Sequence, residues 1–90
     1  MTDANTLKIK LQRELDDLRA MREELDLRET LARAEGRGSW ALLEQELQLA
    51  QEEIDRIGEH SGRAFRDIED ASRARFELIR HGYERIRRER

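Results

Sequence analysis

The two histidines are the residues that could first suggest a metal ion or an acid–base centre. His60 and His81 stand far apart in the sequence, and neither has the Glu-x-x-His or His-x-x-x-His spacing that places two ligands on one helix face. Glu77 precedes His81 by one helical turn, a spacing typical of a surface ion pair. The sequence contains no cysteine, which excludes thiolate metal sites, disulfides and thiol nucleophiles. We therefore expect no bound metal ion.

Serines and glycines could supply a nucleophile or a phosphate-binding loop, but their surroundings fit neither role. Ser39 and Ser61 have no histidine or acid in a nucleophile motif, and helix capping explains both. Gly36 and Gly38 follow a predicted helix, not a strand, and lack the lysine of a P-loop. We predict no catalytic residue and no cofactor, and therefore a protein that is not an enzyme.

Charge is unevenly distributed along the chain. Residues 41–60 contain six acids and one arginine, whereas residues 73–90 contain seven arginines and three glutamates. We expect the basic segment to lie against the acidic one, within one molecule or between two. In the alternative, four arginines contact a nucleic acid or an acidic protein: Arg85, Arg87, Arg88 and Arg90. Interleaved glutamates and a net charge of -3 count against nucleic acid.

The composition is typical of long helices, with 43% charged residues, no proline and five glycines. Apolar residues recur at steps of three and four, which predicts helices over about 4–35, 39–57 and 63–88 in one domain over 1–90, with fraying over 87–90. Glycines separate the helices at Gly36 to Gly38 and at Gly58 to Gly62, and Ser39 is placed to cap the second helix. The sequence thus predicts an all-α fold, an antiparallel three-helix bundle or coiled coil.

A second arrangement remains open. The heptad spacing of the apolar residues in the predicted helix 39–57 continues without interruption past Gly58 and Gly62. A glycine costs a helix only about 1 kcal/mol, so both could lie inside one long helix. The fold would then be a two-helix hairpin whose long helix pairs with a second chain.

Several apolar residues lie off these stripes or beyond the end of a neighbouring helix. A first helix of about 45 Å would extend past a second of about 28 Å, leaving Leu7, Leu11 and Leu15 uncovered at one end and the last turns of the third helix uncovered at the other. Trp40 stands at the central turn, and tryptophan is enriched at the centres of interfaces. We predict a partner-binding surface from the following residues: Trp40, Leu42, Leu49, Leu27, Leu31, Ile9, Tyr83 and Ile86.

A chain of 90 residues buries a modest core, and oligomerisation is a common way to stabilise such a domain. We therefore predict a self-associating protein-interaction module, an adaptor, scaffold or assembly factor, that forms a homodimer or binds another protein. The sequence shows no signal peptide and no apolar run of about 18 residues, so we expect a cytoplasmic protein without a membrane span.

Overall fold

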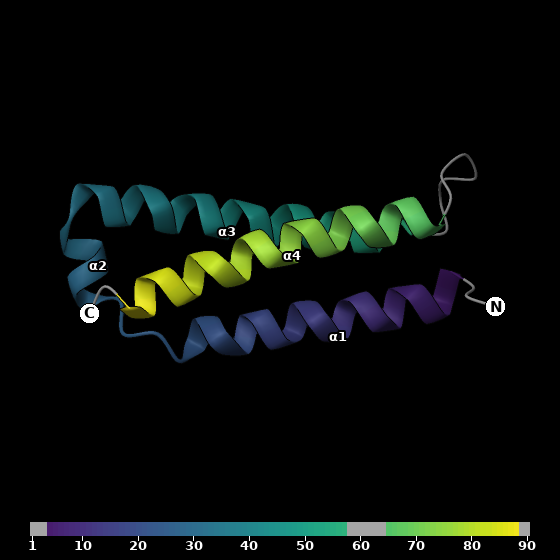
Figure 1. Cartoon of the computed structure of the whole chain (residues 1–90), viewed down its shortest axis with the longest axis horizontal. Coiled ribbons are helices and arrows are strands. Elements are labelled where there is room, and N and C mark those ends of the chain that lie inside the picture. The colour runs from purple at the N-terminus through teal and green to yellow at the C-terminus, as the bar shows by residue number, and fades with distance from the viewer. Residues whose placement is uncertain (1–3, 58–64, 89–90) are drawn as a thin grey trace.

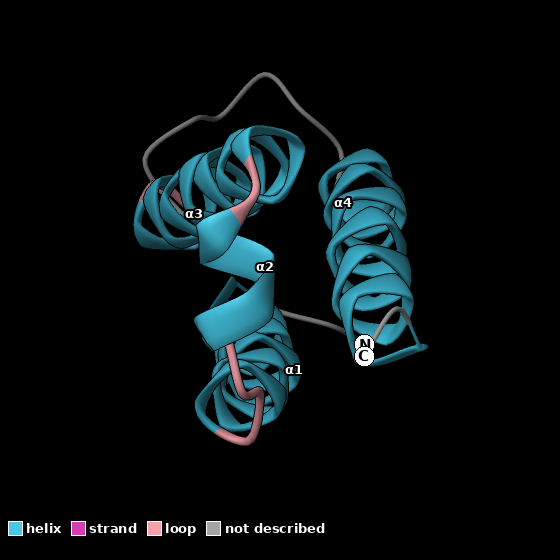
Figure 2. Ribbon diagram, turned by 90° about the vertical axis from the view of Figure 1, so that its left-hand side faces the viewer, coloured by secondary structure: helices cyan, strands magenta, loops and turns pink. Residues whose placement is uncertain are grey.

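A computed structural model describes residues 4–57 and 65–88 of the chain. They form four helices: α1 (Ala4–Glu23), α2 (Arg28–Ala32), α3 (Ala34–Asp55) and α4 (Phe65–Arg88). The three long helices pack side by side, and the short α2 crosses one end of the bundle between α1 and α3 (Figure 1). Seen along the bundle, α1, α3 and α4 occupy the corners of a triangle (Figure 2). The predicted all-α fold of packed helices is confirmed.

Polar contacts between the helices define their directions. Lys10 of α1 contacts Glu69 near the start of α4 at 2.8 Å, and Arg87 at the other end of α4 lies 3.6 Å from Glu24, just after α1. Helices α1 and α4 therefore run in the same direction, and α3 runs opposite to both. Because α3 and α4 pack against each other, the alternative of one long continuous helix is wrong. Gly58 and Gly62 themselves lie outside the described residues.

The core consists of one apolar stripe from each long helix. These stripes recur every three or four residues, so each helix turns a single narrow face inward. Burying one such side chain stabilises the fold by about 1.5–3 kcal/mol. The buried apolar residues are Leu7, Leu11, Leu15, Leu18, Leu43, Leu47, Ala50, Ile54, Ile57, Ile68, Phe76, Ile79, Tyr83 and Ile86.

The first helix ends at Glu23, so the predicted helix over 4–35 is too long. Leu25 and Leu27 both pack against the core, although two positions apart on a continuous helix would point them about 200° from each other. Leaving the helix lets both side chains turn inward. Asp26 stabilises the new direction because its Oδ1 accepts a hydrogen bond from the backbone amide of Arg28 at 3.2 Å.

Helix α3 begins at Ala34 and runs through both glycines, so the predicted break at Gly36 to Gly38 and the cap at Ser39 are wrong. A Cβ atom at Gly36 would lie 1.9 Å from the carbonyl oxygen of Thr30, whereas one at Gly38 would meet no atom within 4 Å. Gly36 therefore permits the close approach of α2 to the first turn of α3. It does not interrupt the helix.

The three long helices have nearly equal lengths of 20, 22 and 24 residues, or about 30, 33 and 36 Å. The predicted overhangs are therefore absent, and Tyr83 and Ile86 are buried together with Leu7, Leu11 and Leu15. Tyr83 and Ile86, two of the predicted partner-binding residues, are thus covered within one molecule. Helix α4 is regular through Arg88, so the predicted fraying does not affect residues 87 and 88, while residues 89 and 90 lie outside the described part.

Candidate functional site

A row of exposed leucines follows the line where α3 and α4 meet. Leu42 and Leu49 lie two turns apart on α3, and Leu78 lies on α4. Their exposed fractions are 54%, 37% and 53%, although large apolar side chains are usually covered in a folded domain. These three leucines and the Glu46–Arg75 pair between the helices are called the docking face below.

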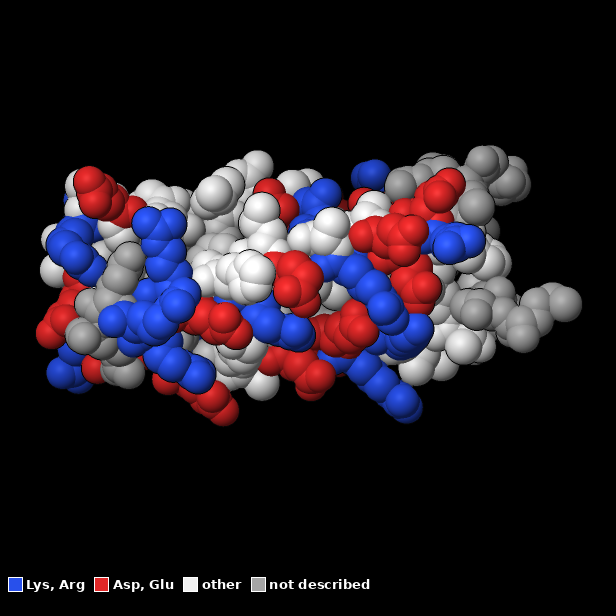
Figure 3. Space-filling model, viewed as in Figure 1, with Lys and Arg blue, Asp and Glu red and all other residues white. Residues whose placement is uncertain are grey.

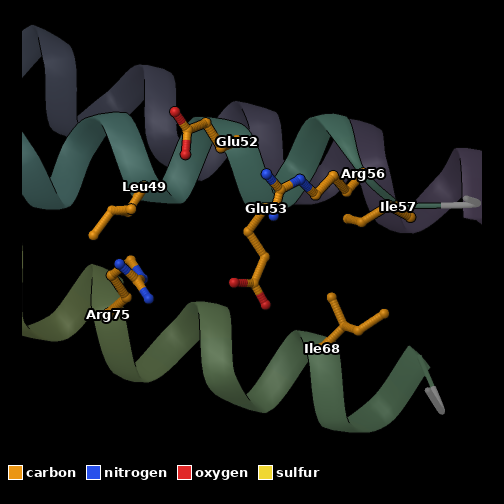
Figure 4. A pocket seen from close by; sticks show the side chains of 7 residues that line it. All are labelled: Leu49, Glu52, Glu53, Arg56, Ile57, Ile68 and Arg75. Carbon is orange, nitrogen blue, oxygen red and sulfur yellow. The ribbon is translucent and has the colours of Figure 1, made fainter. Parts of the chain in front are cut away.

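Two hollows lie along this line. The larger, of about 510 Å³, is formed where α2 crosses the bundle, and Leu42, Leu43, Leu78 and Ile86 give it apolar walls. The smaller, of about 150 Å³, lies toward the other end of α3 and α4. Figure 4 shows Leu49 and Arg75 facing each other from the two helices across the smaller hollow.

An ion pair separates the two hollows. Arg75 Nη1 of α4 donates to Glu46 Oε2 of α3 at 3.0 Å, and both side chains are about three-quarters covered. Burial on this scale reduces solvent screening compared with a fully exposed pair. The pair therefore places one negative and one positive charge at a defined position on the docking face.

Gly82 shapes the larger hollow from the α4 side. A Cβ atom at Gly82 would lie 2.5 Å from Cδ2 of Leu43, which is itself buried. The absence of a side chain at Gly82 thus lets α3 and α4 approach closely beside Leu43. It also leaves space in the larger hollow next to Leu42 and Leu78.

Trp40 belongs to a cluster on another side of α3. Its ring lies 5.9 Å from the ring of Tyr83, and the guanidinium of Arg22 lies over the indole at 5.3 Å. Arg22 also forms a bidentate pair with Glu44, in which Nη2 donates to Oε2 at 2.9 Å. Trp40 is partly buried against the core, so it connects α1, α3 and α4 within one molecule.

The hydroxyl of Tyr83 is buried within this cluster and has no hydrogen-bond partner among the described residues. Burial raises the pKa of Tyr83 to about 12, with a further contribution from the nearby carboxylate of Glu44. Hydrogen bonding to Glu44 raises the pKa of Arg22, which keeps that guanidinium charged.

The other predicted partner-binding residues do not join the docking face. Ile9 is 46% exposed on α1, in a separate shallow hollow formed by Thr6, Lys10, Arg13 and Glu14 of the same helix. Leu31 is 39% exposed on α2. Leu27 packs against the core.

Sequence reasoning found Leu42 and Leu49 because they lie off the core stripe of α3, but it missed Leu78. The available signal was similar, since Leu78 precedes the core residue Ile79 and therefore points away from the core stripe of α4. The Glu46–Arg75 pair gave no local signal, because its partners are 29 positions apart in the sequence.

The arginines predicted to contact an acidic partner lie near the C-terminal end of α4. Arg87 lies 3.6 Å from Glu24, Arg85 lines the larger hollow, Arg88 is exposed, and Arg90 lies outside the described residues. Figure 3 shows positive side chains gathered over this end of α4, with negative side chains next to them. Uncharged atoms gather in the middle of the same face, over α3 and α4.

His81 is exposed and lies 3.6 Å from Glu77, the geometry of a surface pair one turn apart. Within residues 4–57 and 65–88, no group of three histidines and acids is placed to hold a metal ion. His60 and Ser61 lie outside these ranges. Across the same residues, no helix has the length and apolar character needed to cross a membrane.

The docking face is suited to contact with other helices. It combines protruding leucines, hollows that could receive side chains, and one ion pair that would favour particular orientations. Comparison of the chain with protein-family models, with curated proteins and with solved structures found no match, so the geometry of this face is the basis for a functional interpretation.

Proposed function

We propose that this chain is a non-enzymatic protein-interaction module that binds a second copy of itself through the docking face. The main observation is that Leu42, Leu49 and Leu78, from two adjacent helices, expose apolar surface along one line. An interface buries such a patch at its centre and keeps charged groups toward its rim. The self-associated module would serve as an adaptor, scaffold or assembly factor.

The size of the face supports this function. Two helices about 10 Å wide and about 33 Å long present roughly 650 Å² before their side chains interdigitate. A standard protein interface buries roughly 800 Å² per partner, so the two values are comparable. The chain has no cysteine, so no disulfide can stabilise its modest core. Association with a second subunit is another way to stabilise a domain of this size.

Replacing Leu78 with glutamate tests this function. Each dimer would lose two buried leucines and place two charges at the interface, so we expect dissociation to cost at least about 3 kcal/mol less, a roughly 100-fold weaker dimer. Light scattering after size-exclusion chromatography, over a wide concentration range, should show a dimer for the unchanged chain and a monomer for Leu78→Glu.

The matched control is Ile9→Glu, which makes the same change at a similarly exposed residue on α1. This variant should remain dimeric, and circular dichroism should show that both variants keep their helices. A monomeric unchanged chain at high concentration would contradict self-association. Dissociation caused by Ile9→Glu but not by Leu78→Glu would move the interface to α1.

A further inference from the structure

The charges along the docking face are divided between its two helices. Helix α3 contributes acids that line the hollows and one acid between them, here called the acidic wall: Glu35, Glu46, Glu52 and Glu53. Helix α4 contributes a basic row, the basic wall: Arg75 and Arg85. No acid of α4 lines either hollow among the described residues. On the side of α3, two arginines also line the hollows: Arg33, between α2 and α3, and Arg56, just after α3.

A two-fold dimer can bring this face against itself in two ways. With the axis perpendicular to the helices, α3 would lie on α3 of the second copy and α4 on α4. With the axis parallel to the helices, α3 would lie on α4 of the second copy. The first arrangement places acidic wall on acidic wall and basic wall on basic wall, and like charges at close range repel. The second places each acidic wall on a basic wall.

The leucines favour the same arrangement. Leu42 and Leu78 line one hollow from opposite helices, and Gly82 of α4 lies against Leu43 of α3, so Leu42 and Leu78 lie within about one helical turn of each other along the bundle. An axis parallel to the helices preserves height, so Leu42 of each copy would meet Leu78 of the other in one apolar layer. It would also bring the Glu46–Arg75 pair of one copy against the same pair of the other, with opposite charges adjacent.

We infer that two copies pair about a two-fold axis parallel to α3 and α4, so that these helices form a four-helix bundle in which each helix is antiparallel to its neighbours. This inference rests on the proposed self-association and specifies its geometry. The second copy is the occupant because its face would place the basic wall on the acidic wall and the Glu46–Arg75 pair on the same pair. Antiparallel neighbours are also the usual arrangement of four-helix bundles.

Spin labels on single introduced cysteines would measure this geometry, because the chain has no cysteine of its own. Gly38→Cys and Glu52→Cys place labels at exposed sites 14 residues apart on α3, or about 21 Å along the helix axis. Gly38 has open space around its Cβ position, so a Cβ there collides with no other atom of the same chain. Three dimers are compared: each variant with itself, and the two variants mixed.

With the axis parallel to the helices, each variant paired with itself should give a short distance, similar for both positions. The mixed dimer should give a longer distance, because its labels are offset by about 21 Å along the bundle. With the axis perpendicular to the helices, each label would be separated from its copy along the bundle by twice its distance from the axis. Because the two labelled sites are about 21 Å apart, the separations in the two self-paired dimers would add up to at least about 42 Å. That result would overturn the inferred symmetry while leaving self-association intact.

Two controls separate the failure of this geometry from the failure of the proposed function. Adding Leu78→Glu should abolish the distance between labels, whereas adding Ile9→Glu should preserve it. An unchanged, unlabelled chain that remains monomeric by light scattering at every concentration would overturn both the geometry and the self-association. A dimer whose distance survives Leu78→Glu would overturn the use of this face.

Discussion

Tyr83 combines two features that rarely occur together in a stable core. It packs against Trp40 and is fully buried, yet its hydroxyl finds no partner among the described residues. An unsatisfied buried polar group costs about 1–3 kcal/mol, while the ring contributes apolar burial and an aromatic contact. The ring therefore accounts for the stabilisation provided by this residue, and the hydroxyl opposes it.

Replacing Tyr83 with phenylalanine should leave stability at pH 7 unchanged or raise it by up to about 1 kcal/mol. The difference should be larger in alkali. An unfolded tyrosine ionises near pH 10, but burial raises the pKa of Tyr83 to about 12 in the fold. Between these values the unfolded state loses a proton that the folded state keeps, so the unchanged chain should lose about 2 kcal/mol of stability.

Urea unfolding at pH 9 and pH 11.5, followed by circular dichroism, would measure this loss. Tyr83→Phe should remove that part of the pH dependence and leave the part that comes from other groups. Since Tyr83 is the only tyrosine, its ionisation can also be followed directly by ultraviolet absorbance. Titration of the folded chain at pH 10, or an equal pH slope in both proteins, would contradict a buried hydroxyl.

At the scale of elements, the connection between α1 and α3 determines how well the bundle fits together. The chain turns at Leu25 to Leu27, forms the short α2, and enters α3 at Ala34. Arg37 supports this corner because its Nη1 donates to the carbonyl oxygen of Leu31 at 3.0 Å. The corner shortens the first helix to match the other two, which allows one molecule to cover all three apolar stripes.

Gly36 and Gly38 offer a matched pair of substitutions at this corner. Gly36→Ala should destabilise the fold by about 2 kcal/mol or more, because the new Cβ would collide with the backbone of Thr30. Gly38→Ala should stabilise it by about 0.5–1 kcal/mol, because alanine favours a helix and the surrounding space is open. Urea unfolding of both variants would measure the difference. Equal effects, or a stabilising Gly36→Ala, would contradict the close contact of α2 with α3.

The sequence predicted that the chain is helical and that each helix has one apolar face, because both properties depend on the local spacing of apolar residues and on helix propensity. It could not predict the role of Gly36, because a glycine that permits close approach looks the same in sequence as one that ends a helix. The turn after Glu23 was missed because it contains neither glycine nor proline and arises from packing of Leu25 and Leu27. The same limit applied to the docking face, where Leu78 and Leu42 come to line one hollow only after folding.

At the scale of the whole molecule, the proposed dimer links folding to association. When two folded chains stabilise each other, unfolding also separates them, so stability depends on protein concentration. In the unchanged chain, each tenfold rise in concentration around the dissociation constant should add up to about 1.4 kcal/mol per dimer and raise the melting temperature by a few degrees.

Melting curves at several concentrations, followed by circular dichroism, would measure this effect. The melting temperature of Leu78→Glu should not change with concentration, whereas Ile9→Glu should behave like the unchanged chain. A melting temperature of the unchanged chain that stays constant over a hundredfold range, at concentrations where light scattering detects dimers, would contradict the coupling.

Three is an odd number of long helices, and this has a mechanical consequence. The chain enters α1 at one end of the bundle and leaves α4 at the other, in a body about 45 Å long. A segment joined before Ala4 and another joined after Arg88 would be held apart by this rigid length, whereas an even number of helices would return them to the same side. In the inferred dimer, both entrances lie at one end and both exits at the other, so the pair would act as a spacer with two unlike ends.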